Sequence, residues 1–356
     1  MKFYMPVSYY LEENCIKNHK KEILECGKKP LIVTGKHSSK LNGSLYDLIS
    51  ILEDYALFDQ VNENPTVNLC EKGARMGLEQ KVDYVIGLGG GSSMDAAKAI
   101  ALLIKNPDEN KDCFYQKKEL SHLDVICIPT TCGTGSEVTS KAVLSRPELK
   151  QKGSISHDIW PKYAFVDEKY LKSASSSLIV STAVDALAHL IESHLNKNRS
   201  AFSYMCSCYG LSLFKEMKED LIHKEFDYKK LMLASSVAGL AIAQTGTSIP
   251  HAMSYDLTNY FQISHGLACG YYLVSFVEVV MNKSQEGKEI LSLLDFSDIN
   301  EFRNWMETLI GKPKLDQEEF LIELMEQKKS KWDTACVNIT KEDVCFIVHS
   351  SLSCII

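Results

Sequence analysis

The residues best suited to chemistry are one aspartate and three histidines in the second half of the chain. Asp185 and His189 lie four positions apart in TAVDALAHLIESHL, so on a helix they share a face. His251 and His265 follow in SIPHAMSYDL and QISHGLACG. A carboxylate and three imidazoles suit Zn²⁺ or Fe²⁺. By spacing alone, the same residues also fit an ordinary N–H···O contact and packed histidines, so both interpretations stay open here.

The twelve cysteines add nothing to this donor set in the sequence. No two of them have the C-x-x-C spacing of a zinc ribbon or a thioredoxin-like motif. Several, such as Cys127 and Cys269, lie inside apolar runs. We interpret most of them as small buried side chains in a reducing compartment.

A glycine-rich turn is the second feature that could take part in ligand binding. Gly89, Gly90, Gly91 and Ser92 follow a strand-like segment and precede the helix-like segment 93–104. Glycines allow a ligand to approach the backbone, and a helix N-terminus offers free N–H groups to a phosphate. The run is not G-x-G-x-x-G, and a plain tight turn is the alternative. Three consecutive glycines favour phosphate binding, and Ser92 with Asp95 has the spacing of a capping box.

A hydroxyl-rich turn follows the next strand-like segment. Its candidate ligand-binding residues are Thr130, Thr131, Thr134 and Ser136. Hydroxyl and backbone N–H groups suit a pyrophosphate or a ribose. Two such turns after neighbouring strands fit the crevice in which open α/β sheets bind ligands.

The elements that must position these residues change type along the chain. Short apolar strands are expected at 31–35, 82–89, 124–129 and 163–167, alternating with helices, as in a doubly wound α/β domain. Helices alone are expected in the second half, at 182–195, 203–217, 229–244 and 268–281. We therefore expect an α/β domain over 1–172 and an all-helical domain over 173–356.

Composition excludes several classes of protein. The 356 residues are 45% apolar and 24% charged, which argues against a disordered chain or a coiled coil. A net charge of −7 without a basic block argues against a nucleic-acid partner. No apolar run reaches the ~18 residues of a membrane span, and no secretory signal is recognisable, so we expect no membrane partner and a cytoplasmic location.

Taken together, the motifs resemble the iron-dependent (group III) alcohol dehydrogenase family, which is related to glycerol dehydrogenase and dehydroquinate synthase. The similar segments are VIGLGGGSSMDAAKAIA, IPTTCGTGSEVTS, AFVDEKYL, TAVDALAHLIESHL and PHAMSY…QISHGLACG. The resemblance implies an α/β dinucleotide-binding domain, an all-α metal- and substrate-binding domain and a cleft between them. It implies hydride transfer between NAD(P)H and a small alcohol or aldehyde, in a homo-oligomer that is commonly a dimer.

The resemblance also assigns roles to residues. Asp185, His189, His251 and His265 match the ligands of one divalent metal, Fe²⁺ or Zn²⁺. The glycine turn matches the positions that bind the cofactor pyrophosphate, and the hydroxyl-rich turn matches the second cofactor turn.

Three positions concern specificity. Many family members have Asp at the place of Gly35, where a carboxylate would repel a 2′-phosphate. By the same resemblance, we expect Thr34 and Gly35 to contact the cofactor. Because lysines and no acid follow them, we expect NADPH to be accepted. Many members have His at Tyr255, thought to relay a proton; a tyrosine is a poor base near neutral pH, so it leaves the relay in doubt or serves the substrate instead.

The stretch HAMSYDLTNYFQISHG resembles that of members described as phosphonoacetaldehyde reductases, which form 2-hydroxyethylphosphonate. An anionic aldehyde needs a cationic anchor, and Lys141 lies where the family borders its substrate site. Lys152 and His157 follow it, although surface lysines are commonly just solvated.

Other functions remain possible from the sequence. One is a general short-chain alcohol or polyol dehydrogenase. A second is a dehydroquinate-synthase-like lyase, which would need a cluster of basic residues that four arginines do not obviously provide. A third is a non-catalytic dinucleotide-binding or regulatory protein, which has no need of an open metal site.

Overall fold

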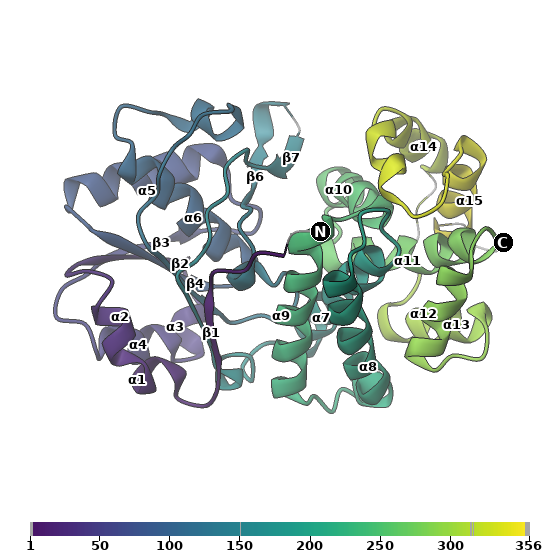
Figure 1. Ribbon diagram of the computed structural model, residues 1–356, viewed down its shortest axis with the longest axis horizontal. Helices are drawn as coiled ribbons and strands as arrows, with labels where there is room; N and C mark the ends of the chain where they lie inside the picture. The colour runs from purple at the N-terminus through teal and green to yellow at the C-terminus, as the bar shows by residue number, and fades with distance from the viewer. Residues whose placement is uncertain (1–2, 150, 314, 316, 353–356) are drawn as a thin grey trace. The chain divides into compact units, whose positions relative to one another are not determined.

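The computed structural model describes residues 3–149, 151–313, 315 and 317–352. It divides into two compact units, one formed by residues 4–174 and the other by residues 175–356 together with the first three residues. The division follows Ala174, two residues beyond the boundary expected from the sequence. Figure 1 shows an α/β arrangement up to that point and helices after it.

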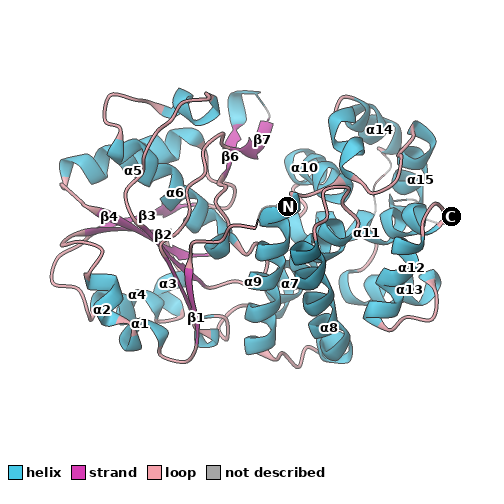
Figure 2. Cartoon of the chain, in the orientation of Figure 1, coloured by secondary structure: helices cyan, strands magenta, loops and turns pink. Residues whose placement is uncertain are grey.

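The α/β unit is built on a six-stranded sheet (Figure 2). Its order is β1-β8-β5-β4-β2-β3, and every pairing is parallel. The strands are β1 (Ser8–Leu11), β2 (Pro30–Gly35), β3 (Ala56–Val61), β4 (Tyr84–Gly89), β5 (Val125–Pro129) and β8 (Tyr163–Val166). The four strands expected from the sequence are confirmed, whereas β1 and β3 were not expected. Chain order reverses direction between β2 and β4, which creates the switch point where such sheets bind ligands.

Alternate residues of β2, β3, β4 and β5 supply two separate cores. Leu31 and Val33 of β2 face one core, and Ile32 between them faces the other. Two-sided burial explains the continuous apolar runs that predicted these strands. The helices of this unit are α1 (Cys15–Asn18), α2 (Lys20–Leu24), α3 (Ser38–Leu41), α4 (Ser44–Ile49), α5 (Val67–Glu79) and α6 (Gly91–Lys105).

Smaller elements complete the α/β unit. Strands β6 (Val143–Arg146) and β7 (Gln151–Ser154) form an antiparallel pair that the sequence did not predict. Short 3₁₀ turns occupy Lys111–Tyr115, Ser136–Val138, Pro147–Leu149 and Glu168–Tyr170.

The second unit is helical throughout the residues that the structure describes. Helix α7 (Ser176–His194) packs against α8 (Ala201–His223), α9 (Tyr228–Thr245) and α11 (His265–Met281). Almost every α7 residue from Ile179 onward is buried, so the helix is apolar nearly all round. The others are α10 (Ile249–Phe261), α12 (Gln285–Leu294), α13 (Ile299–Ile310), α14 (Glu318–Glu326), a 3₁₀ turn at Lys329–Thr334, and α15 (Lys341–Leu352).

Among the described residues, no single helix has the length and apolar character needed to cross a membrane. Helices α9 and α10 meet that test only as a pair, and the pair is bent by 110°.

Candidate metal centre and cofactor turns

Helix α7 carries a buried polar stripe in an apolar helix. Asp185 and His189 are only 3% and 6% exposed, and Glu192 is fully buried one turn further on. Their spacing places all three on one side of the helix. Buried charged groups need partners, and the partners come from α10 and α11.

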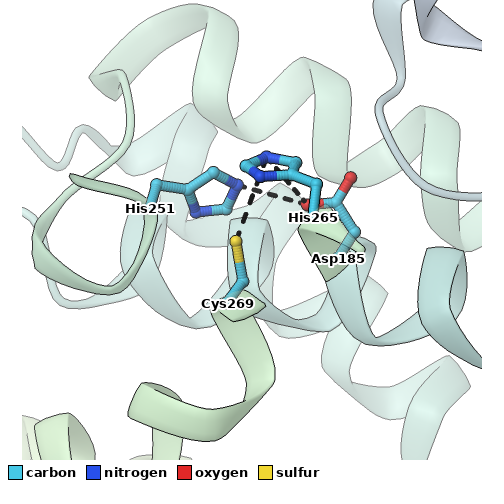
Figure 3. A group of neighbouring side chains, drawn as sticks. All are labelled: Asp185, His251, His265 and Cys269. Carbon is cyan, nitrogen blue, oxygen red and sulfur yellow. Dashed lines mark hydrogen bonds and ion pairs between the residues drawn. The ribbon is translucent and has the colours of Figure 1, made fainter. Parts of the chain in front are cut away.

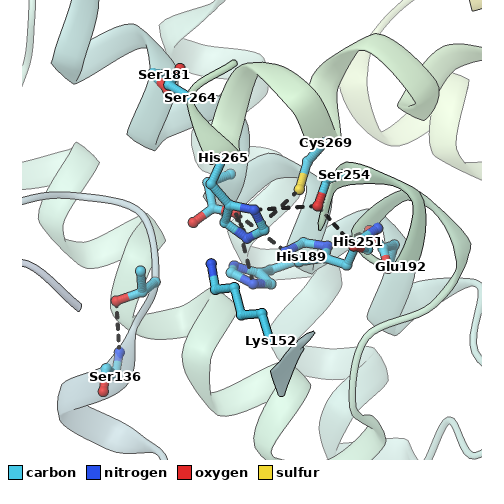
Figure 4. Close-up of polar contacts among 12 residues, drawn as sticks. Ser136, Lys152, Ser181, His189, Glu192, His251, Ser254, Ser264, His265 and Cys269 are labelled. Atoms are coloured by element: carbon cyan, nitrogen blue, oxygen red, sulfur yellow. Dashed lines mark hydrogen bonds and ion pairs between the residues drawn. The ribbon is translucent and has the colours of Figure 1, made fainter. Parts of the chain in front are cut away.

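Glu192 holds the beginning of α10. Its carboxylate accepts hydrogen bonds from the backbone N–H groups of Ser248 and His251, which have no partner within the helix at its first turn. The same carboxylate accepts the Nδ1–H of His251 at 2.5 Å (Figure 4). This bond assigns the proton to Nδ1 and leaves the lone pair of Nε2 available to a metal.

Ser254 does the same for His265, the first residue of α11. The Ser254 hydroxyl donates to the His251 carbonyl at 2.8 Å, so its oxygen accepts from Nδ1 of His265 at 3.3 Å (Figure 4). His265 is thereby also oriented with Nδ1 as the donor and Nε2 as the acceptor nitrogen of its ring. The two imidazoles come from different helices but have the same tautomer.

The four predicted ligands converge on one carboxylate oxygen. Asp185 Oδ1 lies 3.3 Å from His251 Nε2, 3.8 Å from His265 Nε2 and 4.0 Å from His189 Nε2. Metal–donor bonds of about 2.1 Å place the donors of a tetrahedral site about 3.4 Å apart. Asp185, His251 and His265 therefore lie at separations close to those of ligands around a single ion, whereas His189 approaches Asp185 Oδ1 to 4.0 Å without belonging to the compact donor group.

The site also passes a test of fit to a metal. Within the part of the chain that the structure describes, Asp185 Oδ1 and His251 Nε2 are buried and make no hydrogen bond, and the polar contact between them is an ion pair at 3.3 Å. Leaving such atoms without a hydrogen bond is unfavourable, and a cation between them would remove the penalty. Burial alone would raise the pKa of Asp185, but the imidazoles of His189, His251 and His265 hold it well below its usual range.

Cys269 was missed as a member of this site. Its sulfur belongs to a compact group with donor atoms of Asp185, His251 and His265, all within 4.8 Å of one another (Figure 3). Cys269 is buried, as expected for a small apolar side chain, and it also faces the donor set. The available signal was its position four residues after His265, on the same face of α11.

The two cofactor turns contact each other in the α/β unit. Gly89 at the end of β4 pairs with Pro129 at the end of β5, and Thr130 N–H donates to the Gly89 carbonyl at 3.0 Å. A β-carbon at Gly91 would lie 2.6 Å from the Thr134 side chain, so glycine is needed for the approach. A β-carbon added at Gly90 would likewise come close to the Thr131 side chain. The glycine and hydroxyl-rich turns thus form one polar surface beside the N-terminus of α6.

The expected capping box at Ser92 is wrong. Gly90 is the N-cap of α6, and no side chain caps it. Asp95 instead accepts hydrogen bonds from the Ser136 hydroxyl at 2.6 Å and the Val143 N–H at 2.9 Å. Fully buried Lys98 donates to Ser136 as well. These bonds fix the second turn to α6, which sequence reasoning did not anticipate.

Comparison with known proteins gives the family. The sequence profile of iron-containing alcohol dehydrogenase matches residues 6–168, and the C-terminal profile of the Fe-containing alcohol dehydrogenase family matches residues 179–354. The long-chain primary alcohol dehydrogenase of Thermoanaerobacter ethanolicus is 30% identical over 73% of this chain and 69% of its own length. The chain belongs to the iron-containing alcohol dehydrogenase family.

Solved structures agree with this assignment. An iron-containing alcohol dehydrogenase of Thermotoga maritima is 34% identical, with a TM-score of 0.89 over 99% of both chains. A sulfoacetaldehyde reductase of Bifidobacterium kashiwanohense, solved with NAD⁺, is 26% identical over 99% of this chain and 98% of its own, with a TM-score of 0.87. This iron-containing alcohol dehydrogenase is thus an oxidoreductase, and the lyase and non-catalytic alternatives are set aside.

The position that suggested NADPH lies at the end of β2 in this iron-containing alcohol dehydrogenase. Thr34 is buried, and its hydroxyl donates to Ser39 at 2.9 Å. Gly35 is followed by exposed Lys36, whereas Lys40 forms a 2.7 Å ion pair with Asp59. Both lysines are exposed. Among the described residues, Lys40 is paired with a carboxylate, whereas Lys36 has no carboxylate at hydrogen-bonding distance.

Tyr255 contacts the metal centre through its aromatic ring. Its ring stacks on His265, with centroids 5.6 Å apart and planes within 11°. Burial raises the pKa of Tyr255 to about 12, against an opposing effect of His251. The phenol is therefore neutral at physiological pH and can serve as a hydrogen-bond donor but not as a base.

The three candidate anion anchors are all occupied in the α/β unit. Half-exposed Lys141 forms a 2.8 Å ion pair with Asp158. Lys152 donates to the Asn64 side chain at 2.7 Å. His157 is buried and lies 2.8 Å from the Cys113 carbonyl through Nε2. His157 is thus a packing contact, and the anchor role of Lys141 stays a prediction.

Proposed function

We propose that this enzyme is a metal-dependent, NAD(P)H-linked reductase of small aldehydes. One observation carries the proposal: three imidazole nitrogens, from buried His189 and His251 and partly exposed His265, lie within 4.0 Å of one buried Asp185 oxygen. A homo-oligomer in the cytoplasm is part of the same proposal and rests on the family resemblance.

The proposed mechanism assigns separate roles to the residues. Asp185, His189, His251 and His265 would hold the ion, which when bound acts as a Lewis acid on the substrate oxygen. Glu192 and Ser254 keep Nε2 of two histidines available by hydrogen-bonding to Nδ1. The glycine and hydroxyl-rich turns bind and orient the cofactor phosphates. No side-chain nucleophile is required, because hydride transfer forms no bond to the protein.

NADPH is the cofactor that we propose it prefers. An acid that would repel a 2′-phosphate is missing at Gly35, and Lys36 beside it is exposed. A phosphate on the ribose would gain favourable charge there rather than repulsion. NADPH use in turn suits the reductive direction.

The proposed substrate is phosphonoacetaldehyde, which would be reduced to 2-hydroxyethylphosphonate. Two points support it: the resemblance of residues 251–266 to phosphonoacetaldehyde reductases, and the similarity to a reductase of sulfoacetaldehyde, another small anionic aldehyde. Neither point depends on the anchor residue, which is tested separately below.

The experiment is a substrate comparison with the metal-loaded enzyme. NADPH and NADH oxidation would be followed with phosphonoacetaldehyde, sulfoacetaldehyde, glycolaldehyde and propanal. We expect the highest kcat/KM with phosphonoacetaldehyde and NADPH. Similar kcat/KM values for all four aldehydes would replace this substrate by a general short-chain alcohol dehydrogenase, and undiminished turnover after complete metal removal would reject the mechanism.

Lys141→Ala tests the anion anchor. If Lys141 exchanges Asp158 for the phosphonate, the substitution should raise KM for phosphonoacetaldehyde about tenfold, the worth of one charged hydrogen bond, and leave KM for propanal unchanged. The control is Lys162→Ala, because Lys162 forms a similarly exposed ion pair with Asp124 at 2.6 Å. Equal effects on the two aldehydes would remove Lys141 from the substrate site.

A further inference from the structure

Cys269 is a donor at the metal centre that the family ligand set does not contain. It lies on α11, one helical turn after His265, and is fully buried. Its Sγ is 4.0 Å from His265 Nε2. With Cys269 as a fifth donor, a metal–sulfur bond of about 2.3 Å and a metal–nitrogen bond of about 2.1 Å would place neighbouring donors about 3.1–3.8 Å apart. A shift of a few tenths of an ångström would therefore bring the sulfur to bonding distance.

A cysteine alone would be no site, but two neighbouring atoms point to a ligand. Asp185 Oδ1 and His251 Nε2 are buried, face each other at 3.3 Å without making a hydrogen bond among the described residues, and belong to the same 4.8 Å group as the sulfur. Figure 3 shows Asp185, His251, His265 and Cys269 converging from α7, α10 and α11. The position that would satisfy both atoms is within reach of the sulfur.

We propose that Cys269 is a direct ligand of the bound metal, giving an oxygen, nitrogen and sulfur donor set. The inference rests on the proposed metal-dependent function and deepens it. Binding forms a metal–sulfur bond and releases the thiol proton to solvent, with no change in oxidation state. A thiolate donor shifts preference towards borderline and softer ions, so Zn²⁺ should gain over Fe²⁺ compared with a site of only oxygen and nitrogen donors.

The test uses the full-length protein, stripped of metal and titrated with Co²⁺. A coordinated thiolate gives a near-ultraviolet sulfur-to-cobalt charge-transfer absorption, which oxygen and nitrogen donors do not give. We expect this band in the wild type and in Cys206→Ser, a half-buried cysteine on α8. We expect Cys269→Ser to bind Co²⁺ without the band. A wild type that binds Co²⁺ without it, or a band that persists in Cys269→Ser, would overturn the proposal.

A second measurement needs no variant, in case Cys269→Ser does not fold. X-ray absorption of the Zn²⁺-loaded wild type should show one sulfur at about 2.3 Å. A shell of only nitrogen and oxygen would reject Cys269 as a ligand. Such a result with retained metal-dependent aldehyde reduction would leave the proposed function standing, whereas failure to bind either ion at Asp185 would reject both.

Discussion

Glu192 supports the metal centre although it is not one of the predicted ligands. It orients His251 through Nδ1 and holds the first N–H groups of α10. Glu192→Gln should weaken Zn²⁺ affinity about 10–100-fold, as for other carboxylate partners of metal-bound histidines. Competition for Zn²⁺ with a chromophoric chelator measures this affinity.

The matched control is Glu289→Gln. Glu289 contacts His194 at 3.2 Å in the same unit, so it is also a histidine–carboxylate pair, but His194 is not a predicted ligand. An equal loss of Zn²⁺ affinity in both variants would mean that Glu192 acts through general stability rather than through His251.

Tyr255 differs from the usual family residue, and its chemistry limits what it can do. Because its pKa is raised to about 12, it can donate a hydrogen bond but cannot accept a proton near neutral pH. Tyr255→Phe should lower kcat about fivefold, the worth of about 1 kcal/mol of hydrogen bonding, with metal content unchanged. The shape of the pH–kcat profile should stay the same, and loss of an inflection between pH 6 and about 9 would show that Tyr255 titrates after all.

The residue types indicated most, but not all, of the donor set. Asp185 and His189 were visible because four-residue spacing on a helix is local information. The link between Glu192 and His251 was not visible, because it joins positions 59 residues apart. Cys269 was obscured by its apolar neighbours, which are typical of a buried cysteine with no ligand role.

At the scale of elements, the crossing of α7 and α11 controls where His265 lies. A β-carbon at Gly266 would lie 1.8 Å from the Ser181 carbonyl oxygen, which is backbone and cannot rotate away. Gly266→Ala should therefore push the start of α11 from α7. We expect a loss of about 1–3 kcal/mol in the free energy of unfolding, and weaker Co²⁺ binding.

Thermal or urea unfolding and a Co²⁺ titration measure the two effects. Gly153→Ala is the control, because nothing lies within 4 Å of its added β-carbon. An unaltered Co²⁺ affinity in Gly266→Ala would mean that α11 can move without displacing His265.

The elements that the sequence predicted are those with strong local patterns. Strands β2, β4 and β5 are continuous apolar runs, because they are covered on both faces, and β8 is a short run with three buried residues. Strand β3, ALFDQV, has buried, partly buried and exposed positions and so gives a weak signal. The β6–β7 pair has mostly part-exposed residues and is defined by its pairing rather than by its composition.

At the scale of the whole molecule, the proposed metal ligands all belong to the helical unit and the cofactor turns to the α/β unit. Removal of the ion should therefore loosen α7, α10 and α11 and leave β2, β4 and β5 unchanged. An ion at a free concentration 1,000 times its dissociation constant raises the free energy of unfolding by about 4 kcal/mol. This is enough to change the protection of backbone amides from hydrogen exchange strongly.

Hydrogen exchange read by mass spectrometry, with and without chelator, measures this. We expect faster exchange in peptides that contain Asp185, His251 and His265. Equal acceleration in the β2, β4 and β5 peptides would show that the ion stabilises the chain as a whole.

The division of the chain after Ala174 has a consequence for how the protein can evolve by recombination. Apart from its first three residues, the polypeptide passes from one unit to the other at a single point, so one recombination event there exchanges a whole half. A descendant could then acquire a different nicotinamide preference with residues 4–174, including Gly35 and Lys36. It would keep the ancestral preference for a metal ion, because Asp185, His251 and Cys269 belong to the unit that is not exchanged.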